Sequence, residues 1–585
     1  MMKIESFGNG DQDERVSTTD WSIYHLMIVL ALALTAGRIS VVTSREGDTA
    51  FLSANDRSRW ATVASLVERG TYEIDQQISI TNPIHRNRRP WNSIDKVKHL
   101  GKDGKQHFYS SKPPLLATVV AAIYWAVYQV TGMTLTQQPL YVPRLILILF
   151  NLPLLAAFFY STIATIHQRL TSSWARQVAA ASVCFATMVL PFSISLNNHL
   201  PACTATAIVM WIFLRGKNNQ VLKQVSTSQI PAEPPTDQQI ESKQEVNGGK
   251  AQGTEGRESV GIKSHLSSGQ AFIAGTAATL AAANELPALS MTAIWALLFL
   301  LKDRTTLLPF ACGGLLVASA FFGTNWAAHQ SLRPPYAHRG NGELLSSFQS
   351  EVTEPNIELQ KMIADQLESI GDMEREETSG MKAVVISESD EPQRWTVNVG
   401  EIQYGLLREE SGWAIHRWDD WYEYEGTYWK DGARQGVDKG EANKTTYLMN
   451  LTIGHHGIFS LTPIWVLIPL GWLLGLANRN WTERSFHLAV IVATTVCFLF
   501  YLNRPLIDRN YGGVSVCFRW MLWFAPLWLA SISPALDRLG RWRIGRFASL
   551  TLLAFSFFSV ATALQTPWQS PWLYRFWLFL GWIEP

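Results

Sequence analysis

The sequence has little charge for its length. Asp, Glu, Lys and Arg make up 17% of its 585 residues, whereas a soluble protein is usually nearer a quarter charged. The two signs almost balance, with a net charge of +1. Overall charge therefore identifies no partner, and nucleic acid is not expected as one.

Cysteine is also scarce. All five cysteines lie in or at the edge of apolar runs, and none lies in a long polar segment: Cys184, Cys203, Cys312, Cys497 and Cys517. This placement argues against a disulfide framework and against a zinc site.

Long apolar runs are abundant instead. Each run of about 18 to 25 residues can cross roughly 30 Å of hydrocarbon, and many of the 24 tryptophans lie at the ends of runs, as in an interfacial aromatic belt. The pattern predicts an all-α polytopic membrane protein with about eleven transmembrane helices. The expected spans are 22–43, 143–165, 175–192, 200–215, 270–286, 288–301, 306–328, 457–476, 486–503, 517–534 and 546–565.

Segment 113–131 allows two interpretations. It is uncharged, begins at Pro113 and Pro114, and is long enough to span the membrane, yet it also fits an interfacial helix lying flat. The distribution of Lys and Arg favours the flat arrangement, because short basic loops stay in the cytoplasm. The basic connections are those near Arg169/Arg176, Arg215/Lys217, Lys302/Arg304, Arg479/Arg484 and Arg538/Arg541/Arg543/Arg546.

This topology divides the chain into six parts. Residues 1–21 form a cytoplasmic tail, and the first apolar run is a retained span because it lacks a basic leader and a cleavage site. Residues 22–215 form a transmembrane catalytic core with the first external loop at 44–112. Segment 216–269 is a disordered cytoplasmic loop, 270–328 holds further spans, 329–456 is an external inserted module, and 457–585 holds the last spans and an external tail. The expected location is the inner (cytoplasmic) membrane, with the site facing outward.

The inserted module is expected to be a small α+β unit. Residues 351–377 are acidic and helical in pattern, and 383–386 and 395–399 resemble strands. Seven aromatic residues between 413 and 429 either stack on sugar rings or form the core and rim of the module.

The first external loop carries candidate catalytic groups. Asp56 precedes an amphipathic helix that ends at Gly70. Either Asn55 or Asp56 caps this helix, or Asp56 is a catalytic carboxylate at the membrane surface. The many Lys and Arg residues of the loop either contact lipid headgroups or hold a phosphate. A hairpin turning at 103–104 delivers Lys112 to the start of the 113–131 helix, where its ammonium adds to the positive helix terminus and attracts phosphate.

Together, Asp56, the helix ending at Gly70-Thr-Tyr, and Tyr109-Ser-Ser-Lys-Pro-Pro-Leu115 resemble the GT-C glycosyltransferases. The nearest branch is that of the protein O-mannosyltransferases and lipid A aminoarabinose transferases. The resemblance covers roughly residues 20–215. It implies a polyprenyl-phosphate sugar donor, Asp56 as general base, and Lys112, with Arg57 or Arg59, as ligands of the donor phosphate.

The chain also departs from this family. Arg57 stands where many relatives carry Glu, and the second external loop reads Asn197-Asn198-His199 where an acidic residue is frequent. A divalent metal usually wants several carboxylates. Asp48 is a possible second one, so a metal is possible but is not required by the sequence.

The remaining candidates are polar residues at the external ends of the spans. Such residues usually face a cavity, although each one taken alone fits a structural hydrogen bond better than a catalytic role. They are Asn198, His199, Glu285, His455, His456 and Arg519, with Arg519 an ion-pair partner of Glu285 or a phosphate ligand.

The predicted function is transfer of a sugar from a polyprenyl-phosphate donor to an acceptor on the extracytoplasmic face, with inversion. A transporter or flippase for a lipid-linked anion is the alternative, which would place ionisable residues deep within the spans. A non-catalytic cell-envelope scaffold is a third possibility. Membrane lipids are expected partners, and the sequence specifies neither the sugar nor the acceptor.

Overall fold

The computed structural model describes residues 9–215, 266–371, 384–389, 391–430 and 432–584. Most of the segment expected to be disordered, 216–265, lies outside these residues. Within them, seven helices are long and apolar enough to cross a membrane, which supports an integral, multi-pass membrane protein. Three further apolar helices are shorter, at His199–Leu214, Leu286–Lys302 and Pro463–Leu476, so the expected count of about eleven is not established.

The first half of the chain supplies the long first helix, the polar loop with its hairpin, and the apolar helices that follow it. Its elements are α1 (Asn9–Ser40), α2 (Ala54–Arg69), α3 (Asp75–Ser79), β1 (Lys96–Leu100), β2 (Gln106–Ser110), α4 (Pro114–Thr131), α5 (Tyr141–His167), α6 (Ser173–Phe185), α7 (Val189–Phe192) and α8 (His199–Leu214).

The second half supplies the remaining helices and the module. Its helices are α10 (Ser268–Asn284), α11 (Leu289–Lys302), α12 (Leu307–His329), α13 (Ile357–Ser369), α14 (Lys444–Thr452), α15 (Ile458–Leu461), α16 (Ile468–Leu476), α17 (Trp481–Leu502), α18 (Ala525–Ser531), α19 (Ser533–Leu539), α20 (Arg543–Ala563) and α21 (Trp572–Phe579). Its strands are β3 (Asn341–Gln349), β4 (Val384–Glu388), β5 (Arg394–Val399), β6 (Ile402–Glu409) and β7 (Gly412–Trp418). Short 3-10 turns include η4 (Gly436–Lys439), η5 (Pro463–Leu467), η6 (Leu506–Asp508) and η7 (Arg519–Phe524).

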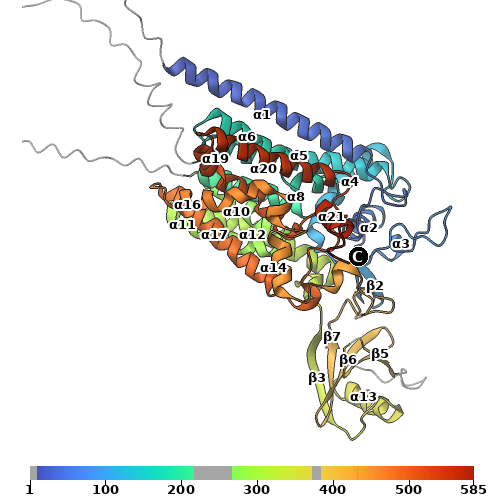
Figure 1. Ribbon diagram of the computed structural model, residues 1–585. Coiled ribbons are helices and arrows are strands. Elements are labelled where there is room, and N and C mark those ends of the chain that lie inside the picture. Colours follow the sequence, from blue (N-terminus) through green and yellow to red (C-terminus); the bar gives the residue numbers. More distant parts are fainter. Residues whose placement is uncertain (1–8, 216–265, 372–383, 390, 431, 585) are drawn as a thin grey trace, which may run out of the picture.

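Helices form a bundle whose two ends differ. Figure 1 shows α2, α3, β2 and the sheet module at one end, together with the end of the chain, while α19 lies at the other. We call the first the loop end. The helices pack closely: an added Cβ at Gly275 would lie 1.9 Å from the Phe310 oxygen, so α10 and α12 touch backbone to backbone.

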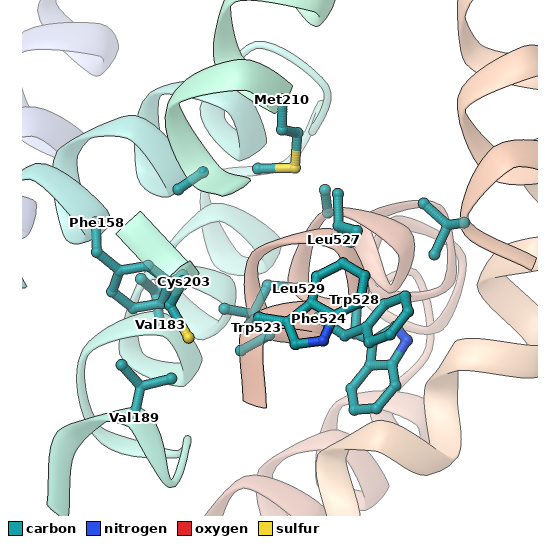
Figure 2. Packing of buried hydrophobic residues seen from close by; sticks show 14 of the residues in the cluster. Phe158, Val183, Val189, Cys203, Met210, Trp523, Phe524, Leu527, Trp528 and Leu529 are labelled. Atoms are coloured by element: carbon teal, nitrogen blue, oxygen red, sulfur yellow. The ribbon is translucent and has the colours of Figure 1, made fainter. Parts of the chain in front are cut away.

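Apolar packing holds α8 in the centre of the bundle. Figure 2 shows Cys203 and Met210 of α8 gathered with Trp523 and Leu527, in the buried cluster that also contains Phe158 of α5. Because this packing fixes α8, it also fixes the position of its first residues at the loop end.

The hairpin and the α2 terminus form as expected. β1 and β2 pair antiparallel, and Gly104 in their turn has a φ of +76°, a conformation that glycine adopts without steric cost. Gly70 ends α2 with a φ of +73°. The residue that caps α2, however, is Ser53, and neither Asn55 nor Asp56. Asp56 lies three residues later and closes a capping box with Ser53.

Helix α4 packs within the loop end. Its buried side chains share a cluster with Ile39 and Val42 at the end of α1, and with Ile146 and Leu147 near the start of α5. α4 is long and apolar enough to span the membrane. Whether α4 spans the membrane or lies flat stays a prediction.

The inserted module is α+β, as expected. Its five-stranded sheet has the order β3-β7-β6-β5-β4 with all neighbours antiparallel. α13 covers the sheet, contributing Leu359, Ile363 and Leu367 to a core with Trp413 and Ile415. α13 is shorter than the helix expected over 351–377, and 372–383 lies outside the described residues.

A stack of rings joins the module to the hairpin. His99 of β1 lies between Tyr109 of β2 and Trp421, with ring centroids 4.2 and 4.0 Å apart. Trp421 in turn stacks on His338 at 3.5 Å. The Lys98 N–H also donates to the Trp421 carbonyl at 2.8 Å, so hairpin and module are fixed to each other at the loop end.

Candidate functional site

A chain of buried polar contacts crosses the loop end of the bundle. The Arg59 guanidinium on α2 donates to Asn198 Oδ1 at 3.0 Å. The Asn198 amide donates to Glu285 Oε1 at 2.7 Å, and Nδ1 of His199 bonds the same oxygen at 2.5 Å. Arg519 then donates to His199 Nε2 at 2.8 Å.

This chain unites five of the sequence-predicted residues: Arg59, Asn198, His199, Glu285 and Arg519. The Arg519 guanidinium can only donate, so His199 Nε2 accepts and its Nδ1 carries the proton toward Glu285. Arg519 and Glu285 are therefore linked through a neutral imidazole and not by the direct ion pair that the sequence suggested.

Lys112 joins the same site through a carboxylate that sequence reasoning missed. Its Nζ lies 3.1 Å from Asp95 Oδ1, and it lines a small cavity of about 10 Å³ together with Arg59 and His329. Asp95 directly precedes β1 and is a lone acid in a lysine-rich segment. That pattern was the feature of the sequence that could have identified it. Burial lowers the pKa of Lys112.

Among the groups bonded directly within this network, cations outnumber carboxylates by three to two. Arg59, Lys112 and Arg519 are three cations, and Asp95 and Glu285 are the carboxylates bonded to its members. Burial lowers the pKa of Arg59 to about 10, so it remains charged at neutral pH. Within the described residues, the buried Arg59 Nε has no hydrogen-bond partner. The arrangement can therefore receive an anion.

Asp56 is fully buried beside this network. Its Oδ1 accepts from the Ser53 N–H at 2.8 Å and from the Ser53 hydroxyl at 3.2 Å, and its Oδ2 accepts from the Leu52 N–H at 2.9 Å. Burial raises the pKa of Asp56 to about 6, although these hydrogen bonds oppose the shift. Because a carboxylate oxygen has two lone pairs, Oδ2 keeps one to accept a proton.

Arg57 and Asp48 lie elsewhere. Both line a separate cavity of about 300 Å³ with Arg88 and Arg89, and the Arg57 guanidinium donates to the Asn92 carbonyl at 3.0 Å. The structure therefore does not bring Arg57 next to Lys112, nor Asp48 next to Asp56.

His455 and His456 face each other, with their Nδ1 atoms 2.5 Å apart. His456 also stacks on Tyr511 at 4.1 Å. The two rings converge because they lie in a turn, where consecutive side chains are not held apart as on a helix. In the described parts of the chain, no group of three or more His, Cys, Asp or Glu side chains is arranged to hold a metal.

An apolar groove adjoins Arg519. This second cavity, of about 30 Å³, is lined by Phe518 and Cys517 next to Arg519, and by Leu461, Trp465 and Met188 of neighbouring elements. Its polar neighbours are few, so it suits a hydrocarbon chain.

Asp438 is a further carboxylate that sequence reasoning missed. It lies in η4 on the module, with its Oδ2 accepting from the Tyr428 hydroxyl at 2.9 Å. Burial raises the pKa of Asp438, and so does nearby Asp95, while Arg519 lowers it. Nothing in the local sequence marked it, because the loop reaches the site only through the fold of the module.

Solved structures provide the comparison. No protein-family model matches the chain, and no curated protein does. An oligosaccharyltransferase from Archaeoglobus fulgidus, in the apo form, matches with a TM-score of 0.39 and 10% identity, over 96% of this chain and 57% of that one. The protein O-mannosyltransferase complex of S. cerevisiae, bound to the sugar donor, matches with a TM-score of 0.42 and 10% identity, over 96% and 92%.

A further A. fulgidus structure, in complex with an inhibitory peptide and a dolichol-phosphate, has a TM-score of 0.37 and 11% identity, over 94% and 56%. The chain thus spans little more than half the length of the oligosaccharyltransferase. Because each of these TM-scores lies below 0.5, the function is argued below from this chain's own residues.

Proposed function

We propose that the chain is a membrane glycosyltransferase that moves a sugar from a polyprenyl-phosphate donor to an acceptor on the extracytoplasmic face. The observation that carries the proposal is the cluster of Arg59, Lys112 and Arg519 beside an apolar groove. An anionic head attached to a long hydrocarbon tail is the ligand chemistry that fits both features.

The two halves of the donor occupy neighbouring places in this proposal. The phosphate lies among Arg59, Lys112 and Arg519, and the first isoprene units lie in the groove lined by Phe518 and Trp465. Glu285 and His199 position Arg519 without contacting the donor. Because a guanidinium binds phosphate with paired N–H groups, Arg59 and Arg519 suit this role better than lysines would.

The reaction is a single displacement at the anomeric carbon. The acceptor oxygen forms a bond to that carbon, the bond from the carbon to the phosphate oxygen breaks, and the phosphate leaves on its polyprenol. The three cations stabilise the charge that develops on the phosphate. Asp56 takes the acceptor proton, and a base with a pKa of about 6 is well matched to neutral pH. One displacement inverts the anomeric configuration.

Binding distinguishes this function from a general lipid site. The purified protein in nanodiscs is titrated with farnesyl phosphate and with farnesol, which differ only in the anionic head. We expect farnesyl phosphate to bind more tightly, and Arg519→Gln to weaken it about 10- to 100-fold, because a hydrogen bond to a charged group contributes about 1.5–3 kcal/mol. Arg541→Gln is the matched control, since Arg541 is exposed near α19.

Equal affinity for farnesol and farnesyl phosphate would show that the protein has no phosphate site. Turnover separates the enzyme from the alternatives. A transferase releases free polyprenyl phosphate from a sugar-loaded donor, whereas a flippase or a scaffold binds the donor through the same residues and leaves it intact.

A further inference from the structure

A third cavity lies in the inserted module, apart from the lipid-phosphate site. It has a volume of about 300 Å³ and is lined by residues of the module together with Ile507 of η6. This volume lies in the range of small-molecule sites. The groups facing it include Tyr422, Trp429, Arg339 and Asp420.

The aromatic wall of this cavity is held rigidly. The Trp429 indole N–H donates to the Ile94 carbonyl at 2.9 Å, and the Arg434 guanidinium donates to the Trp429 carbonyl at 2.7 Å. The Arg339 guanidinium lies 3.9 Å from the Tyr422 ring centre and 5.6 Å from that of Trp429. Trp429 is half-buried, so part of its ring remains available to a ligand.

The charges of the lining balance. Three carboxylates and three cationic side chains face the cavity, and buried Arg394 lies 3.4 Å from Asp420 and 3.6 Å from Glu423. A balanced lining gives no preference to an anion or a cation. It does offer alternating donors and acceptors, which suit hydroxyl groups because each hydroxyl both donates and accepts.

The cavity adjoins the proposed reaction centre. Ile94, which holds Trp429, immediately precedes Asp95, and Asp95 bonds Lys112 at 3.1 Å. Ile507 reaches the cavity from the segment that leads to Arg519. The wall that holds Trp429 is therefore continuous, through Ile94 and Asp95, with Lys112, a proposed ligand of the phosphate.

We propose that this cavity binds an uncharged saccharide, which is the acceptor or its non-reducing end. That the saccharide is the acceptor rests on the proposed function. That the cavity binds a saccharide does not. Trp429 supplies the apolar face for a sugar ring, and the carboxylates and guanidinium groups bind its hydroxyls. A peptide fits less well, because Ile507 is the sole aliphatic side chain in the described lining.

The test is direct binding to the full-length protein in nanodiscs. The probes are neutral trisaccharides of mannose, glucose and N-acetylglucosamine, compared with trigalacturonate and a Ser/Thr-rich peptide. We expect at least one neutral trisaccharide to bind, and Trp429→Ala to raise its Kd about tenfold or more. Trp429→Phe keeps an aromatic face and should retain most of the affinity. Trp542→Ala, at an exposed tryptophan near α19, should leave it unchanged.

A second variant protects the test against misfolding. Ile507 is 41% exposed, so Ile507→Trp fills the cavity from η6 without disturbing the core, and it should abolish binding. Absence of binding by every neutral trisaccharide, unchanged binding in both Trp429→Ala and Ile507→Trp, or tighter binding of trigalacturonate or the peptide would overturn the inference. Arg519→Gln should weaken the binding of farnesyl phosphate but leave the binding of the trisaccharide unchanged. Failure of the saccharide site is therefore distinguishable from failure of the proposed function.

Discussion

Replacing Asp56 by Asn separates a catalytic role from a structural one. The amide oxygen can still accept one set of hydrogen bonds, but the amide nitrogen replaces an acceptor. One of the N–H groups of Leu52 and Ser53 therefore loses its partner. Loss of a helix-capping interaction, or a buried donor left without a partner, costs about 1–2 kcal/mol. As a general base, Asp56 would contribute about 100- to 10,000-fold to the rate.

Ser53→Ala is the matched control for this substitution. It removes the hydroxyl that accepts from the Asp56 N–H at 3.1 Å and so weakens the same capping box at a cost of about 1 kcal/mol. It leaves the Asp56 carboxylate in place. Both variants should melt at a lower temperature than the wild type, by similar amounts.

The assay is release of polyprenyl phosphate from a sugar-loaded donor, measured below the melting temperature of both variants. We expect Asp56→Asn to lose at least about 100-fold in rate and Ser53→Ala to stay within a few-fold of the wild type. If the two variants lose activity equally, or if Asp56→Asn keeps wild-type turnover, Asp56 only completes the capping box of α2, and another carboxylate such as Asp438 must take the proton.

Three further predictions follow from the contacts described above. The transfer rate should rise with pH and level off above about 6, because burial raises the pKa of Asp56 to about 6. The folded chain holds this proton more tightly than the unfolded chain, so the free energy of unfolding should fall as the pH rises from about 4 to 6. A transfer rate independent of pH in this window would argue against Asp56 as the base. Glu285→Gln should slow transfer about 10- to 100-fold without unfolding the protein, because the charge-assisted bonds to Asn198 and His199 are each worth about 1.5–3 kcal/mol; wild-type kinetics would show that the network is dispensable. Gly275→Leu should prevent stable insertion, because its side chain would collide with the backbone of Phe310, and a monodisperse, wild-type-like chromatographic profile would contradict that packing.

Much of the loop end could be predicted from local patterns. The hairpin turn at Gly104, the end of α2 at Gly70 and the start of α4 at Pro114 depend on the conformations of single residues, and short-range rules capture these. The predicted topology placed four polar residues at the same ends of neighbouring spans, where their side chains can come into contact. They are Asn198, His199, Glu285 and Arg519.

What could not be predicted depends on contacts between distant segments. Arg57 and Arg59 are two residues apart, yet they face different cavities because successive side chains on α2 point around the helix. Asp95 meets Lys112 through the pairing of β1 with β2, whereas Asp438 and Trp429 come near only because the module folds back onto the hairpin. The aromatic cluster also divides: Trp413 is core, Trp421 joins the ring stack, and Trp429 lines a cavity.

The stacked rings of His99, Trp421 and His338 hold the hairpin and the module in a fixed relative position. Lys112 follows β2 by two residues, so the module cannot swing away without either separating these rings or pulling the lysine with it. We therefore expect movement of the module to change the position of Lys112, the proposed phosphate ligand, and ligand binding at Lys112 to change the position of the module in return.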